Sequence, residues 1–129
     1  MTPLHDDDLK RLYARALVSI VRADEEIDAE EGERLKTRIE ERSQLELEDV
    51  LLETAVHPDE LAEAVAVGPF RSAPIRGDEI ARMLVEDALY VTLGKGHITP
   101  DEGARLLRYA RALGLPDDEL QALTERWLP

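Results

Sequence analysis

The sequence predicts an all-α protein of about seven helices, packed as one domain from two similar halves. Apolar residues recur at the three-and-four spacing of a buried helix face through most of the chain. No segment alternates apolar and polar residues with the β-branched enrichment of a strand. A pattern at residues 22–35 returns in degenerate form at residues 93–106. This recurrence indicates an internal repeat.

The repeat aligns at an offset of 71 residues. Five identities support the alignment: Ile27, Glu31, Gly32, Arg34 and Leu35 meet Ile98, Glu102, Gly103, Arg105 and Leu106. The predicted single domain covers residues 1–129, with a first half at about 6–68 and a second at about 75–129. The connection between the halves is rich in turn-forming residues, namely Gly68, Pro69, Ser72, Pro74 and Gly77.

Four helices are predicted in the first half, at about residues 8–23, 28–43, 46–54 and 57–68. The buried face of the first is formed by Leu9, Leu12, Tyr13, Ala16, Leu17, Ile20 and Val21. Asp28 and Glu31 stand at the N-cap and third position of the second helix, which is a capping-box arrangement. The third buries Leu47, Val50 and Leu51. The pair Gly68-Pro69 ends the fourth.

Three helices are predicted in the second half, from residue 75 or 78 to 93, from 100 to about 113, and from 117 to 127. The inner stripe of the first contains Ile80, Leu84, Ala88 and Val91. Thr99, Pro100 and Glu102 supply the N-cap, the first-turn proline and the capping-box glutamate of the next. Gly114 ends that helix as a glycine C-cap. The last presents Leu120, Leu123 and Trp127.

Glycine recurs at the fourth helical position of both copies, as Gly32 and Gly103. Glycine at such a position costs up to about 1 kcal/mol relative to alanine. The recurrence therefore predicts that a neighbouring helix passes close to both glycines.

The composition narrows the class of protein. With 129 residues, 43% of them apolar, the chain is long enough to bury one core. The absence of cysteine excludes disulfides, thiolate metal sites and a cysteine nucleophile, and suits a reducing compartment. No apolar run approaches the about 20 residues of a membrane span, and the acidic N-terminal residues do not resemble a signal peptide. A cytoplasmic location is expected.

The formal net charge of −13 excludes some partners and favours others. Such a surface repels nucleic-acid phosphates and anionic membranes. It favours cations or a basic protein surface, and solubility alone is the alternative explanation.

The stretch Asp24-Glu25-Glu26-Ile27-Asp28, followed by Glu31, is the most acidic part of the chain. With Ile27 at position eight of an EF-hand loop, Ile20 and Arg22 fall on ligand positions and Glu25 replaces the glycine. The stretch is therefore no EF-hand. Two alternatives remain: a site of another kind for a hard cation, or acids explained by the helix cap and a solvated face.

Two further residues bear on function. Asp87 lies on the apolar stripe of its helix, where a carboxylate needs a hydrogen bond or an ion pair. One reading binds it to a backbone amide or to an arginine such as Arg15 or Arg105; the other places it in a site between the two repeat turns. His97, in the second turn, either faces solvent or faces the acids of the first.

Short motifs resemble the TerB-like family of tellurite-resistance proteins. The first turn reads Ala23-Asp24-Glu25-Glu26-Ile27 with Glu31, and the second reads Gly94-Lys95-Gly96-His97-Ile98 with Glu102. Asp87-Ala88-Leu89 and the junction of residues 110–120 also match family patterns. The resemblance implies an all-helical fold of two related halves.

The resemblance also implies that acids of these turns bind a divalent cation, with calcium as the preferred candidate. Carried over by position, it implicates Asp24, Glu31, Glu102 and Asp87, and the acidic cluster adds Asp28. Two departures from the family pattern weaken this assignment of ligands, in the second turn more than in the first. Glu25 replaces the family's first glycine, and Lys95 replaces the second aspartate with a charge that opposes a cation.

Three functions follow as hypotheses. The first is a non-catalytic, stress-associated TerB-like module that acts through a cation-dependent surface and protein partners. The second is an adaptor that docks a basic partner without metal. The third is an enzyme that uses clustered carboxylates; the chain lacks a phosphate-binding glycine loop, a nucleophile elbow and a Cys/His pair. We therefore expect that the protein is not an enzyme.

Overall fold

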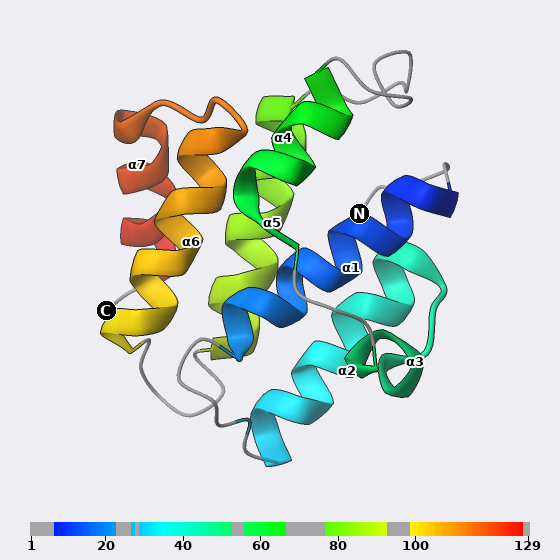
Figure 1. The fold of residues 1–129 in the computed structure, drawn as a ribbon. Helices are drawn as coiled ribbons and strands as arrows, with labels where there is room; N and C mark the ends of the chain where they lie inside the picture. Colours follow the sequence, from blue (N-terminus) through cyan, green and yellow to red (C-terminus); the bar gives the residue numbers. More distant parts are fainter. Residues whose placement is uncertain are drawn as a thin grey trace.

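The computed structural model describes residues 7–22, 27, 29–52, 56–66, 77–92 and 99–127. This part of the chain contains helices and no strand (Figure 1). The helices are α1 (Asp7–Val21), α2 (Ala29–Ser43), α3 (Leu47–Leu51), α4 (Pro58–Ala66), α5 (Gly77–Thr92), α6 (Pro100–Ala112) and α7 (Asp117–Trp127).

The structure confirms the predicted fold class and the order of the helices. α7 has the predicted bounds, whereas α3 ends at Leu51, earlier than the predicted residue 54. Apolar periodicity locates long helices well, but their ends depend on local capping. The division into two similar halves stays a prediction.

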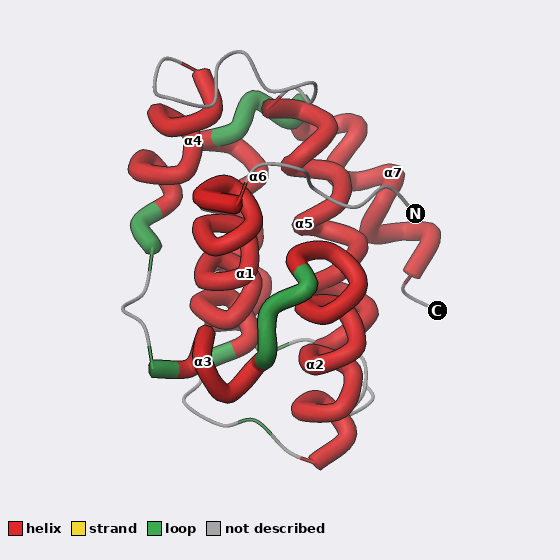
Figure 2. Tube along the Cα trace, turned by 90° about the vertical axis from the view of Figure 1, so that its right-hand side faces the viewer, coloured by secondary structure: helices red, strands yellow, loops and turns green. Residues whose placement is uncertain are grey.

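α1 and α5, one from each predicted half, occupy the centre of the fold. α1 packs against α2, α3, α4, α5 and α6, and α5 packs against α1, α2, α4, α6 and α7. Figure 1 shows α6 and α7 on one side of these two helices and α2 and α3 on the other. Figure 2, turned by 90°, shows α1 and α2 side by side. Ala14 and Val18 are therefore buried outside the predicted stripe of α1, because helices cover that helix on several sides.

The ends of α6 form as the sequence predicts. The Thr99 hydroxyl accepts from the backbone N–H of Glu102 at 3.2 Å, and the Glu102 carboxylate accepts from the backbone N–H of Thr99 at 2.9 Å. This reciprocal pair is a capping box. At the other end Gly114 has a φ of +89°, and Leu115 N–H donates to the Ala110 carbonyl at 3.0 Å. That geometry is a Schellman C-cap, which a residue with a Cβ would strain.

The prediction of close helix packing at the two glycines is wrong for the described residues. A Cβ at Gly103 would meet nothing within 4 Å, and one at Gly32 would meet only the Ile27 side chain at 3.9 Å, an ordinary contact. Both glycines are half-buried at the edge of their helices. The recurrence of a glycine in the sequence therefore does not by itself show that a neighbouring helix packs closely against it.

Two arginines that the repeat aligns make the same kind of contact. Arg34 of α2 donates to the carbonyl of Tyr90 in the last turn of α5, at 2.9 Å. Arg105 of α6 donates to the carbonyl of Ser19 in the last turn of α1, also at 2.9 Å. Carbonyls there lack partners within their own helix, and a cation beside them is favourable. Each predicted half thus supplies the positive charge at the end of the other's central helix.

The cap of α6 gives a test of the fold. We expect Thr99→Ala to lower the free energy of unfolding by about 1 kcal/mol, because the hydroxyl that satisfies the Glu102 N–H is lost. Urea denaturation measures the change. Thr37→Ala is the control: Thr37 lies exposed within α2, where alanine is the better helix former. An equal loss in both variants would contradict the capping role.

Candidate functional site

The structure describes three of the five acids predicted as cation ligands. Asp24 and Asp28 lie outside the described residues. Glu31, Asp87 and Glu102 are all buried, with 1%, 0% and 0% of their surface exposed. Aspartate and glutamate are almost never fully buried without compensating partners. The surroundings of each acid therefore indicate what it does.

Glu31 and Glu102 occupy the same place at the starts of α2 and α6. The carboxylate of Glu102 accepts from the backbone N–H of Thr99 at 2.9 Å and from its hydroxyl at 3.0 Å. In both Glu31 and Glu102 the Oε2 atom is buried and makes no hydrogen bond to a described residue. Both side chains nevertheless have further interactions. These two acids thus place carboxylate oxygens inside the protein directly after the two turns.

Asp87 has a different role, because arginine surrounds it. Arg42 Nε lies 2.8 Å from Oδ2 and Arg42 Nη2 lies 3.0 Å from Oδ1, a bidentate pair that is fully buried. The Tyr13 hydroxyl donates to Oδ2, and Arg38 Nε lies 3.5 Å from Oδ1. Asp87 therefore joins α5 to α1 and to α2.

The prediction that an arginine pairs with Asp87 is confirmed, but the proposed arginines, Arg15 and Arg105, are wrong. A signal for Arg42 was present in the sequence. Glu31, Leu35, Ile39 and Arg42 follow one another at helical spacing, and all four are buried. Arg42 therefore extends the inner face of α2 toward the core, where only a carboxylate could compensate its charge.

The pKa values of two groups in this network, Tyr13 and Arg42, are both raised. Burial raises the pKa of the Tyr13 hydroxyl well above its usual value, and the charge and hydrogen bond of Asp87 raise it further. Burial alone would lower the pKa of Arg42, but the hydrogen bond and charge of Asp87 more than offset it, so that pKa is raised. The network therefore holds a neutral phenol and a charged guanidinium around the carboxylate.

A second set of contacts joins α2 to α5. Arg34 and Arg38 lie over the ring of Tyr90, with Cζ 4.8 and 4.2 Å from its centroid. Arginine over an aromatic face is attracted by the ring quadrupole. Both arginines belong to α2 and Tyr90 to α5, so the same two helices are joined again beside the ion pair.

These surroundings decide which acids fit a cation. Asp87 does not fit, because guanidinium groups and a phenol hydroxyl already surround both of its oxygens. Within the part of the chain that the structure describes, no three His, Asp or Glu side chains are grouped closely enough to hold a metal ion. Glu31 and Glu102 retain the right chemistry, since calcium and magnesium prefer carboxylate oxygens. A site at either turn needs ligands from beyond the described residues.

The comparison with protein families identifies the chain's family. The family model described as tellurite resistance protein TerB matches residues 11–125. This covers nearly the whole chain, which therefore belongs to the TerB family. Neither the curated proteins nor the solved structures give a match.

The buried ion pair predicts a large loss of stability. We expect Asp87→Asn to lower the free energy of unfolding by about 3–5 kcal/mol, because Arg42 would keep its charge in the core without a counter-ion. Chemical denaturation measures it. Glu40→Gln, which removes an exposed acid of α2, should change it by less than about 0.5 kcal/mol. Arg42→Met should also destabilise, and the double variant should lose less than the two single losses combined; strict additivity would contradict the pairing.

The raised pKa of Tyr13 predicts a loss of stability at alkaline pH. Above the ordinary tyrosine pKa of about 10 the unfolded chain releases this proton, whereas the folded protein retains it. Stability should therefore fall as the pH rises through 10. Urea midpoints measured between pH 8 and 11 should fall less steeply in Tyr13→Phe. Part of the slope should remain, because burial also raises the pKa of Tyr109. Identical slopes in both proteins would contradict the buried phenol.

Proposed function

We propose that this member of the TerB family is a non-catalytic, stress-associated module that works through protein partners. It holds a divalent cation at its first turn, and calcium is the preferred candidate. The family's description as tellurite resistance protein supports the stress association. A cytoplasmic location belongs to the same proposal, which the cysteine-free, acidic sequence supports. Among the described helices none is long and apolar enough to cross a membrane.

The burial of Glu31 is the observation that carries the cation proposal. Glu31 is 1% exposed and lies within seven positions of Asp24, Glu25, Glu26 and Asp28 in the sequence. Like charges this close in the chain repel one another, and burial strengthens the repulsion because it reduces screening by water. A bound cation would offset that repulsion, and six to eight oxygens, some from backbone or water, would complete its shell.

The first turn is the better candidate of the two. Both turns are followed by a buried glutamate, Glu31 or Glu102. Glu102 already accepts two hydrogen bonds from Thr99 within its capping box. The second turn also carries Lys95 where the first carries Asp24 in the family pattern, and a lysine repels a cation. Glu102 is therefore explained better as a cap.

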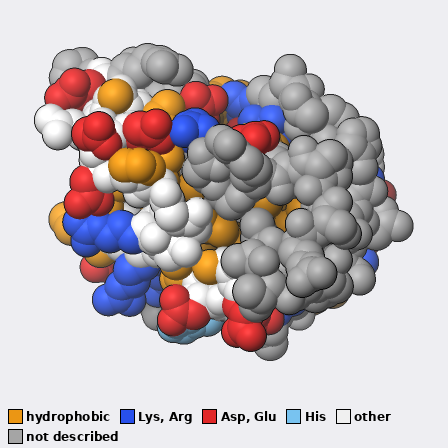
Figure 3. Space-filling model, turned by 90° about the horizontal axis from the view of Figure 1, so that it is seen from above, with side chains coloured by type: hydrophobic (Ala, Val, Ile, Leu, Met, Phe, Trp, Pro, Cys, Tyr) orange, Lys and Arg blue, Asp and Glu red, His pale blue; other side chains and the backbone are white. Residues whose placement is uncertain are grey.

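A metal-independent adaptor is the second candidate, and the net charge of −13 favours it. Exposed acids can dock a basic partner surface through charge complementarity, which added salt weakens. Figure 3 shows acidic and basic side chains close together on the described part of one face, so the charge is not of a single sign there. Partner binding that survives EDTA unchanged would favour this adaptor over the cation-dependent module.

A thermal melt tests the cation. After EDTA treatment, we expect calcium at millimolar concentration to raise the melting temperature by several degrees, more than magnesium or manganese. A ligand at one hundred times its Kd stabilises by about 2.7 kcal/mol. Asp24→Ala should abolish the rise, because it removes a ligand of the first turn.

The control is Asp49→Ala, which removes an exposed acid from the first turn of another helix, α3. It should keep the full response to calcium. An equal, slight shift for every divalent cation in all three proteins would mean that the acids only attract counter-ions, and would overturn the site.

A further inference from the structure

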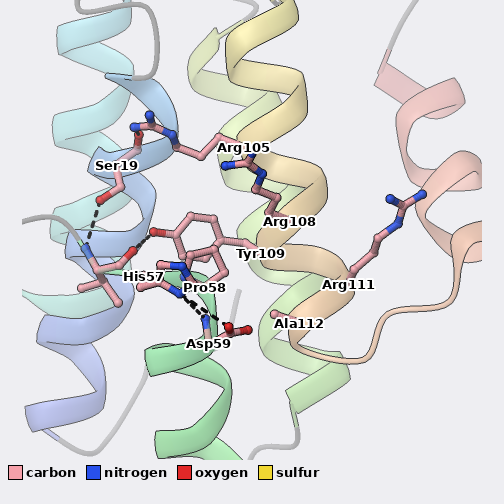
Figure 4. Close-up of a pocket in the computed structure, with 10 residues that line it drawn as sticks. Ser19, His57, Pro58, Asp59, Arg105, Arg108, Tyr109, Arg111 and Ala112 are labelled. Carbon is pink, nitrogen blue, oxygen red and sulfur yellow. Dashed lines mark hydrogen bonds and ion pairs between the residues drawn. The ribbon is translucent and has the colours of Figure 1, made fainter.

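A cleft of about 670 Å³ opens where the end of α1, the start of α4 and one side of α6 meet (Figure 4). Small-molecule sites commonly have volumes of about 300–1,000 Å³. None of the acids predicted as cation ligands lines this cleft. It is therefore a separate feature from the first turn.

The α6 wall of the cleft is basic although the protein is acidic. Arg105, Arg108 and Arg111 line it at a spacing of three residues along the helix. Arg105 Nη1 is held by the Ser19 carbonyl at 2.9 Å, and Arg111 Nε pairs with Asp117 at 3.2 Å. Arg108 is exposed and has no acidic partner among the described residues. Figure 4 shows Arg105 reaching across to Ser19 of α1 and Arg111 extended toward α7.

The opposite wall adds a hydrogen-bond donor and the start of a helix. His57 Nδ1 accepts from the backbone N–H of Asp59 at 3.1 Å, so a neutral ring carries its proton on Nε2, where it can donate. α4 begins at Pro58, and the N-terminal end of a helix favours negative charge. Asp59, which is exposed, is the acid on this wall.

The floor of the cleft is apolar and fixed in place. The Tyr109 hydroxyl donates to the carbonyl of Val56, which ties α6 to the segment before α4. Val56 and Tyr109 are both buried, and Pro58 and Ala112 continue this apolar surface. A ligand here would therefore meet arginine on one side and hydrocarbon below.

We propose that this cleft binds a small organic phosphate, with the phosphate group at Arg105, Arg108 and His57 and an apolar part against Pro58 and Ala112. Arginine presents planar donors that match phosphate oxygens. Two guanidinium charges match the negative charge of about 1.5–2 on a phosphate monoester at neutral pH. The cleft is larger than an inorganic phosphate alone would fill. We therefore expect the ligand to carry an apolar group beside its phosphate.

Isothermal titration at low ionic strength, with EDTA present, tests the proposal with phenyl phosphate as the probe. We expect saturable binding by the wild-type protein, weaker binding of inorganic phosphate, and none of phenol. Arg108→Ala should weaken the binding of phenyl phosphate about tenfold or more, since a charged hydrogen bond is lost. Asp59→Asn should tighten it, because it removes the opposing charge.

Lys36→Ala is the matched control, since it removes an exposed positive charge from α2, which does not line the cleft. It should bind phenyl phosphate as the wild type does. Three results would overturn the proposal: no saturable binding to the wild type, equal affinity in Arg108→Ala, or equal weakening in Lys36→Ala. Inorganic phosphate binding as tightly as phenyl phosphate would overturn the apolar part of the site.

Discussion

The carboxylate of Asp87 imposes the strictest constraint on this fold. A charge fully inside the protein must be matched by opposite charge and by hydrogen bonds, or the folded state loses stability. Arg42 and Tyr13 supply that match from two different helices. Because the arginine binds through two nitrogens, it fixes both the rotation of α2 and its position along α5. A purely apolar interface between the same helices would specify these less sharply.

A second set of contacts joins the predicted halves at the ends of the central helices. Neither α1 nor α5 carries a basic residue in its last turn. Arg105 and Arg34, from α6 and α2, supply the missing positive charge at those ends. The arginines differ by 71 positions, and so do the carbonyls of Ser19 and Tyr90 that accept from them. The two contacts therefore follow the offset of the sequence repeat, whereas the Asp87 pair has no such counterpart, since Ala16 stands at the equivalent position.

The sequence predicted the helices well and their contacts less well. Periodicity shows which face of a helix is buried, and Asp87 on that face was expected to need a hydrogen bond or an ion pair, which Arg42 and Tyr13 supply. It does not show which helix lies opposite, and the arginine comes from α2 and is neither Arg15 nor Arg105. The cleft could not be predicted at all, because Ser19, His57 and Arg108 come from three separate segments. Asp24 and Asp28 lie outside the described residues, so the first-turn ligands rest on the sequence.

The charge of the whole chain bears on how a cleft of this kind could select a ligand. At −13 the protein repels anions at long range, so steering does not help a phosphate to arrive. Binding would then depend on short-range contacts with correctly placed donors. Arg105 has two roles, since it lines the cleft and also holds the end of α1 through Ser19. The basic wall thus includes a side chain that the packing already requires, whereas Arg108 is exposed and makes no ion pair within the part of the chain that the structure describes.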